Sequence, residues 1–251
     1  MPLYRSDHIE YNISSGHITI NTDDGDRVSA YWAHPARGTK FPGIALVHNW
    51  WGMTDIVRQM AHLYAQMGYY VIAPDLFNGA RPKTHQEAME CVKAMGEDGF
   101  EGIDAAISIL ETHYLCSHKN AAVGIGMGGS LAFESAIKRD DLEVAVAFYG
   151  FPHKYFGQFA QSNTPILAVY GDHDKIIRPT VIKKLKQELH ASPLKSEHRI
   201  AMIPGAGHDF IRESRDEATR RYVGQAWQAA IDFIEQYIEP PKNPNKAQQA
   251  Y

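Results

Sequence analysis

The chain has 251 residues, of which 44% are hydrophobic, and a formal net charge of −4. This length and composition suit one large domain with a substantial core, and the charge gives no reason to expect nucleic acid or an anionic membrane as a partner. The two cysteines, Cys91 and Cys116, lack metal-ligand spacing and are too few for a disulfide framework. With no signal-peptide segment and no membrane-length apolar run, we expect a soluble cytoplasmic protein, monomeric or a small homo-oligomer.

Predicted strands and helices alternate along most of the chain. Strands are expected over or within residues 17–22, 27–35, 43–48, 69–76, 120–126, 142–150, 164–174 and 197–208. Helices are expected over residues 53–68, 83–95, 100–115, 127–139, 178–190 and 214–238. Thr54 is predicted to cap the first helix, and Ser214 with Glu217 to form a capping box at the last. The alternation predicts a mostly parallel sheet in one domain over residues 1–238, followed by a loose polar tail over 239–251.

Residues that can carry chemistry follow several of the predicted strands. They lie in segments 48–51, 75–81, 124–129, 149–153, 171–174 and 205–212. In an open parallel sheet the functional crevice lies outside the carboxyl ends of the strands. We therefore expect these segments to face one rim of the sheet.

The segment GIGMGGS, residues 124–130, lies between a predicted strand and a predicted helix. That is the setting of a nucleophile elbow, which presents Ser or Cys at the centre of G-x-S-x-G. Here the central residue is Gly126. Asp174 after a later strand and His208 after the last strand complete the nucleophile, acid and base order of α/β-hydrolases. The chain is therefore predicted to have the α/β-hydrolase fold, with a mostly parallel central sheet flanked by helices.

Four motifs carry a resemblance to a known family: ALVHNWWGM, YYVIAPDLF, GIGMGGSLAF and PGAGHDFIR. With these motifs, residues 18–238 resemble the dienelactone hydrolase family. The resemblance implies a small α/β-hydrolase without a large cap, which opens lactones and cleaves some esters. It implies no cofactor and no metal.

The resemblance also implies roles for individual residues. Asp174 matches the acid of the catalytic triad, His208 matches its base, and Gly126 stands at the nucleophile position. The backbone N–H groups of Trp50 and Met127 match the donors of an oxyanion hole. The residues expected at the substrate are Asn49, Trp51, Arg81, Tyr149 and Arg212. Arg212 matches a carboxylate-binding arginine of the family, and Arg81 lies close to a second such position but is offset from it.

Two positions depart from the family pattern. The nucleophile of the family is normally Cys, where this chain has Gly126, and a Glu that manages the thiol proton is replaced by Asn49. Glycine adopts the positive φ of an elbow at little steric cost, so the turn should persist. One hypothesis is a hydrolase of small lactones or carboxylic esters with reduced or water-based activity; the other is an inactive binding protein for a small carboxylate.

Other interpretations of these residues are weaker. Ser130 in GGSLA resembles a nucleophile motif, but helical phase places it one turn inside the helix. His48, Asp172, His173, Asp174 and His208 could be taken for a metal cluster, although their spacing matches no standard ligand motif. GIGMGG resembles a dinucleotide fingerprint, but that motif belongs to the first βα unit of its fold. Trp50 and Trp51, at a predicted strand end, are expected to line a pocket wall.

Overall fold

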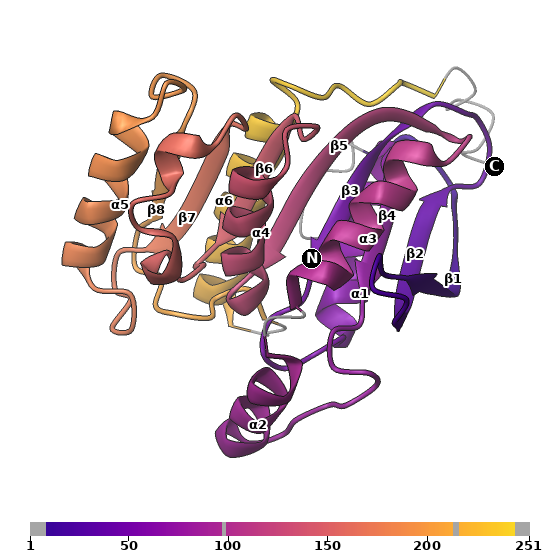
Figure 1. Cartoon of the computed structure of the whole chain (residues 1–251). Coiled ribbons are helices and arrows are strands. Elements are labelled where there is room, and N and C mark those ends of the chain that lie inside the picture. The colour runs from indigo at the N-terminus through magenta and orange to yellow at the C-terminus, as the bar shows by residue number, and fades with distance from the viewer. Residues whose placement is uncertain (1–8, 97–98, 213–215, 244–251) are drawn as a thin grey trace.

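The computed structural model describes residues 9–96, 99–212 and 216–243 (Figure 1). Within these residues, eight strands form one sheet in the order β1-β2-β4-β3-β5-β6-β7-β8. The strands are β1 Ile13–Asn21, β2 Arg27–Pro35, β3 Phe41–Val47, β4 Tyr70–Pro74, β5 Cys116–Ile125, β6 Val144–Phe148, β7 Ile166–Gly171 and β8 Arg199–Ile203. β1 and β2 pair antiparallel with their neighbours, and β4, β3, β5, β6, β7 and β8 pair parallel. The predicted mostly parallel sheet is therefore confirmed.

Helices cover both faces of the sheet. They are α1 Asp55–Met67, α2 His85–Met95, α3 Gly99–Thr112, α4 Met127–Lys138, α5 Pro179–Ala191 and α6 Glu217–Ile234, with short 3-10 turns at His153–Tyr155 and Phe159–Gln161. Figure 1 shows α3, α4 and α5 on one face and α1 and α6 on the other. Every residue of β3, β4, β6 and β7 is buried, which explains why their sequences are apolar without alternation.

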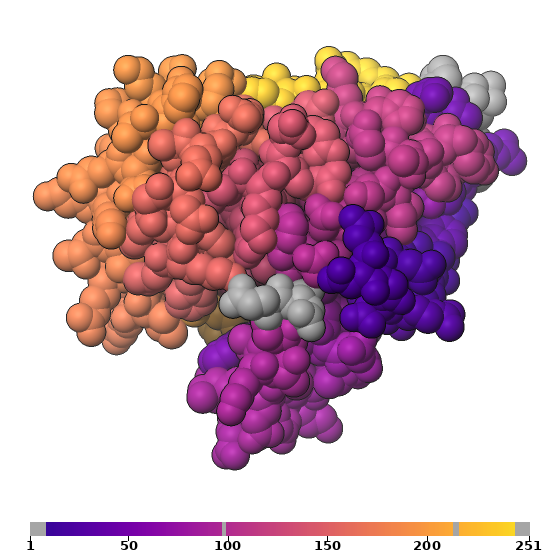
Figure 2. Space-filling model, viewed as in Figure 1, coloured from indigo at the N-terminus to yellow at the C-terminus, as the bar shows by residue number. Residues whose placement is uncertain are grey.

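The helix α2 projects from the main body on the side where β5 ends (Figures 1 and 2). Only Ala88 of its residues is buried, so tertiary packing contributes little to this helix. Its N-terminus is held locally, because the Glu87 N–H donates to the Thr84 hydroxyl and the Lys83 N–H donates to the Glu87 carboxylate. In the part of the chain that the structure describes, the segment with α2 and α3 is the longest connection between two successive strands, here β4 and β5. The described residues form no separate cap domain.

The helix caps differ in part from the sequence prediction. Thr54 is the N-cap of α1, but its side chain makes no capping hydrogen bond, and its buried hydroxyl has no partner among the described residues. The helix α6 begins at Glu217, and the Asp216 carboxylate accepts from the Thr219 N–H. The predicted box of Ser214 and Glu217 is wrong in register, because Glu217 is the first residue of the helix; Ser214 itself lies outside the described residues.

The start of the polar tail is attached to the N-terminal segment. The Tyr11 hydroxyl donates to the Pro241 carbonyl at 2.8 Å, and the Asn243 amide donates to the Glu10 carbonyl at 2.8 Å. Residues 239–243 are therefore held, contrary to the prediction of a loose tail, and residues 244–251 lie outside the described part. None of the described helices combines the length and apolar character that crossing a membrane requires.

Candidate active site

The predicted functional segments meet at one rim. The strands from β4 to β8 are parallel, so their carboxyl ends share one edge of the sheet, and the candidate residues follow these ends. In the molecule this edge lies on the side from which α2 projects (Figure 1). The fold thus brings together residues that are up to 160 positions apart in the chain, as for Asn49 and Asp209.

The turn between β5 and α4 has the backbone of an elbow. Gly126 is the N-cap of α4 with φ 56° and ψ −113°, and its N–H donates to the Phe148 carbonyl at 2.8 Å. Positive φ at this strand-to-helix turn was predicted from GIGMGGS and is confirmed.

The glycines of this turn are not equivalent. A Cβ placed on Gly124 would lie 1.9 Å from the Gly128 carbonyl oxygen, and one on Gly128 would lie 2.4 Å from the Val47 carbonyl oxygen. These two positions require glycine because the backbones touch. At Gly126 the nearest atom to such a Cβ is the Asn49 Cβ at 3.4 Å, which is ordinary contact. The turn therefore has room for a side chain at Gly126.

His208 and Asp174 form a hydrogen-bonded pair on the same rim. The His208 Nδ1 lies 2.8 Å from the Asp174 Oδ2, and the Asp174 side chain is buried while that of His208 is 19% exposed. The other carboxylate oxygen, Oδ1, accepts from the backbone N–H groups of Ile176 and Ile177 at 2.7 and 2.9 Å. Because both oxygens of Asp174 have a donor, the imidazole has one preferred orientation, with Nδ1–H toward Asp174; no described residue bonds to Nε2, which can act as a base.

Tyr149 connects the elbow to this pair. Its Cε2 atom lies 3.5 Å from the position of a Cβ on Gly126, and its ring centroid lies 5.2 Å from that of His208. Tyr149 therefore lies against both the Gly126 position and the His208 ring. The backbone of Tyr149 has φ 39°, an uncommon value for a non-glycine residue that marks strain at this point of the rim.

A carboxylate that the sequence analysis did not single out, that of Asp209, lies at this rim. Asp209 accepts from three neutral donors: the Asn49 amide at 3.4 Å, the Trp51 indole N–H at 3.3 Å and the Tyr149 hydroxyl at 3.2 Å. The same Asn49 holds its own turn, because its Oδ1 accepts from the Trp51 N–H at 3.1 Å. The only sign of Asp209 in the sequence was its place directly after His208. Its donors follow β3 and β6, and only the strand order of the sheet brings them close to it.

The Tyr149 hydroxyl donates to Asp209 in an apolar setting. Burial raises the pKa of Tyr149 well above its ordinary value, and the negative charge of Asp209 raises it further. The phenol therefore stays protonated and acts as a hydrogen-bond donor over the whole neutral range.

The predicted oxyanion donors are the backbone N–H groups of Trp50 and Met127. Met127 is the first residue of α4, where an N–H has no acceptor within its own helix. Neither N–H donates to a backbone carbonyl among the turn and loop hydrogen bonds of the described residues. Both residues are half-buried, so a substrate oxygen could approach them, and their role stays a prediction.

The two predicted carboxylate-binding arginines differ in setting. Arg81 forms a two-pronged ion pair with Asp75, with nitrogen to oxygen distances of 2.8 and 3.3 Å, and its remaining contact is the Ala80 carbonyl at 2.8 Å. Its charge is therefore already balanced. Arg212 is exposed and forms no ion pair with another described residue. Arg212 remains available for a carboxylate, whereas Arg81 holds the 75–81 loop.

Three aromatic side chains pack together, and one of them, Trp51, donates its indole N–H to Asp209. The ring centroids of Trp50 and Trp51 lie 5.3 Å apart, and His85 at the start of α2 lies 5.2 and 5.4 Å from them. Both tryptophans are half-buried, which fits the expected pocket wall. The loop that carries them and the projecting helix α2 thus meet at the rim.

The weaker interpretations of the sequence find no support in the geometry. The Ser130 hydroxyl lies inside α4 and accepts from the Phe151 N–H at 2.9 Å, which is a structural role. His48 is fully buried, and backbone groups of Asn49 and Leu76 occupy its two ring nitrogens at 2.7 and 3.1 Å. Among the described residues no group of three or more His, Cys, Asp or Glu side chains is arranged to hold a metal ion.

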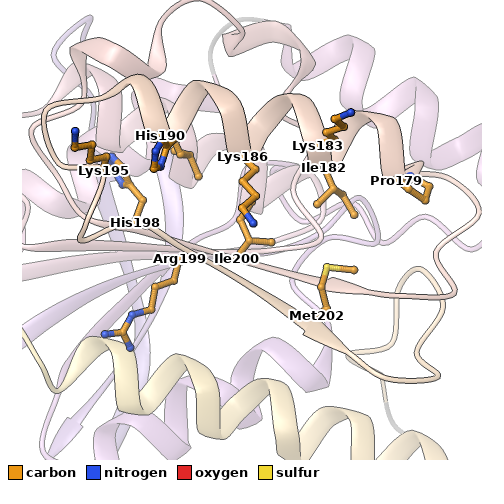
Figure 3. Close-up of a pocket in the computed structure, with 11 residues that line it drawn as sticks. Pro179, Ile182, Lys183, Lys186, His190, Lys195, His198, Arg199, Ile200 and Met202 are labelled. Carbon is orange, nitrogen blue, oxygen red and sulfur yellow. The ribbon is translucent and has the colours of Figure 1, made fainter.

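A separate groove of about 520 Å³ lies between α5 and the edge strand β8 (Figure 3). Its lining includes Ile182, Lys183, Lys186, Lys195, Ile200 and Met202, none of which is a predicted site residue. His198 lies at one end, where burial lowers its pKa to about 4. Its Nδ1 accepts from the Ile166 N–H at 3.1 Å, so the neutral ring is part of the fold.

The family of the chain is shown by a match that covers most of its length. The model of the dienelactone hydrolase family matches residues 28–238. Protein usf of Aquifex pyrophilus is 24% identical over 225 residues, covering 86% of this chain and 96% of that protein, and a carboxymethylenebutenolidase of Pseudomonas putida is 25% identical over 228 residues, covering 86% and 94%. A dienelactone hydrolase-like promiscuous phosphotriesterase from metagenomic libraries has the same fold, with a TM-score of 0.78 at 18% identity, covering 90% of this chain and 98% of the other.

Proposed function

Because the chain belongs to the dienelactone hydrolase family, we propose that it hydrolyses small lactones or carboxylic esters with water as the direct nucleophile. The observation that carries this proposal is the hydrogen-bonded pair of His208 and Asp174 beside an elbow whose central residue, Gly126, has no side chain. A base and its orienting acid are present, and the group that would form a covalent intermediate is not.

In this mechanism a water molecule occupies the room beside Gly126 that a nucleophile side chain would fill. The water oxygen attacks the carbonyl carbon of the substrate while the Nε2 of His208 takes its proton. The carbonyl oxygen becomes an oxyanion, for which the N–H groups of Trp50 and Met127 are the proposed donors. The tetrahedral adduct then expels the alkoxide, which takes the proton back from His208, and the products are an acid and an alcohol.

The expected rate is modest. General-base assistance contributes about 10²–10⁴-fold, and in serine proteases that lack triad members the oxyanion hole and binding leave roughly 10³–10⁴-fold over water. Both contributions rest on groups that this chain retains. The proposal therefore predicts slow turnover without an acyl-enzyme, rather than no turnover.

The competing function is a hydrolase-shaped binding protein for a small carboxylate. The specific observation in its favour is the missing side chain at Gly126 together with an exposed Arg212 that forms no ion pair with another described residue. This alternative predicts stoichiometric binding of a carboxylate and no turnover of its ester or lactone.

The test is steady-state hydrolysis of an unactivated lactone, followed by proton release. We expect His208→Ala to lower kcat by about 10²-fold or more. His173→Ala is the matched control, because the exposed His173 ring lies on the same rim 4.0 Å from the Asp172 carboxylate, whereas Asp174 pairs with His208. Equal rates in the unmodified protein, His208→Ala and buffer would contradict the hydrolase proposal, and binding without turnover would select the alternative.

A further inference from the structure

The carboxylate of Asp209 is held by neutral hydrogen-bond donors. Its three partners, from Asn49, Trp51 and Tyr149, are all neutral donors, and this is the pattern that an ionised carboxylate accepts. In the part of the chain that the structure describes, no Lys, Arg or His forms an ion pair with it. Arg81 is paired with Asp75, and Arg212 is exposed, with its positive charge opposing the rise in the pKa of the Tyr149 hydroxyl.

The conformation of this carboxylate is imposed by its surroundings. Asp209 has φ 54° and its partner Tyr149 has φ 39°, so both residues of the Asp209–Tyr149 hydrogen bond have the positive φ that side chains disfavour. Strain of this kind persists where the surrounding structure holds it, and it gathers at ligand sites. The side chains of Asn49 and Tyr149 also flank Gly126. The carboxylate that they hold therefore lies close to the elbow.

Aromatic rings adjoin the anion. The Trp51 side chain that donates its N–H to Asp209 also packs against Trp50 and His85. Tryptophan faces attract cations, and aromatic rings next to a carboxylate are the surroundings that an alkylammonium group requires. Charge and ring chemistry therefore point to the same kind of ligand.

We propose that Asp209, with the Trp50 and Trp51 rings, forms a recognition site for an ammonium group, so that the preferred substrate is a small ester or lactone carrying a primary or quaternary ammonium near the scissile bond. The claim that the ammonium compound is a substrate rests on the proposed function. The claim that the site binds an ammonium group does not. Arg212, at the exposed end of the same loop, keeps its predicted role toward a carboxylate. Asp209 contributes specificity and takes no part in proton transfer.

The experiment compares two ligands of the same shape and different charge. Choline and 3,3-dimethylbutanol differ only in a quaternary nitrogen in place of a carbon, and the acetate esters of both serve as substrates. We expect choline to bind about ten- to a hundredfold more tightly than the uncharged alcohol, measured by titration calorimetry. Asp209→Asn should remove this difference, while Asp140→Asn, which makes the same charge change at an exposed position beyond the other end of α4, should keep it.

A second measurement uses the unmodified protein, in case Asp209→Asn does not fold. Raising NaCl from low to molar concentration should weaken choline binding several-fold and leave the uncharged alcohol unchanged. Equal affinities for the two alcohols, or a preference that survives in folded Asp209→Asn, would overturn the ammonium site. Failure of the proposed function is separate: if neither acetate ester is hydrolysed, the binding ratio still decides the inference, and if both are hydrolysed with equal kcat/KM, the hydrolase stands and the ammonium site falls.

Discussion

Placing a nucleophile at Gly126 is the most direct perturbation of this site. A Cβ at this position has its nearest neighbours at 3.4 and 3.5 Å, on Asn49 and Tyr149, so the first side-chain atom of Ser or Cys makes only ordinary contacts, while the positive φ strains any side chain there. We expect Gly126→Ser and Gly126→Cys to introduce covalent catalysis. The new side chain would give its proton to His208, which Asp174 orients, and would attack the carbonyl carbon to form an acyl-enzyme.

Two magnitudes follow from the geometry. A side chain at φ 56° costs about 1–3 kcal/mol of stability, which for a chain of this size lowers Tm by roughly 2–12 °C. The gain in kcat should be at least about 10²-fold, and less than the roughly 2 × 10⁶-fold that subtilisin loses without its serine. Ser should perform about as well as Cys, because no carboxylate stands at Asn49 to manage a thiol and the anion of Asp209 disfavours a thiolate.

The assay is pre-steady-state hydrolysis of an activated aryl ester. A burst of phenol equal to the enzyme concentration, together with the mass of one acyl group on the protein, would identify the intermediate. Gly126→Ala is the matched control, since it adds the same strain without a nucleophile. Adding His208→Ala to Gly126→Ser should abolish the burst.

The result that refutes this reasoning is specific. If Gly126→Ser and Gly126→Cys fold with the Tm of Gly126→Ala and neither gives a burst, then His208, Asp174 and the elbow do not form a working triad. A burst that survives His208→Ala would also refute it, because the proton acceptor would then lie elsewhere.

Three further outcomes are expected. Arg212→Ala should weaken binding of a carboxylate-bearing lactone about tenfold and leave its uncharged analogue unchanged, as isothermal titration can measure; no change for either would make Arg212 only a surface charge. Arg81→Ala should lower the free energy of unfolding by about 1–3 kcal/mol in urea titrations, because it leaves the buried Asp75 carboxylate without its cation, and Arg81→Ala with Asp75→Asn should recover part of that loss. Burial lowers the pKa of His198 to about 4, so between about pH 6.5 and 4 the unfolded chain binds more protons than the folded chain. The free energy of unfolding therefore falls as pH falls through that window, by about 1–2 kcal/mol once the partial exposure of the ring is allowed for. His198→Gln should flatten this pH dependence in urea titrations at pH 7 and 4.5, whereas the exposed His190→Gln should not.

The sequence alone determined the alternation of strands and helices and the order of the chemical groups along the rim. Periodicity and turn chemistry are local properties, so β2 begins and ends at the predicted residues 27 and 35, and the turn at Gly126 has the predicted positive φ. The His208–Asp174 pair was predictable from the strand pattern, because each residue follows a parallel strand and all such ends share one edge.

Only the tertiary structure decided which side chains balance one another. Asn49, Trp51 and Tyr149 were expected at the substrate, yet each donates to Asp209, which no local pattern distinguishes from a solvated loop residue. The strand order β3-β5-β6-β7-β8 brings the strand ends that carry these partners to one rim, and nothing in the spacing along the chain encodes it. A hydrogen bond or ion pair acts over about 3–4 Å. The pairing of these side chains therefore depends on distances that exist only once the sheet has assembled.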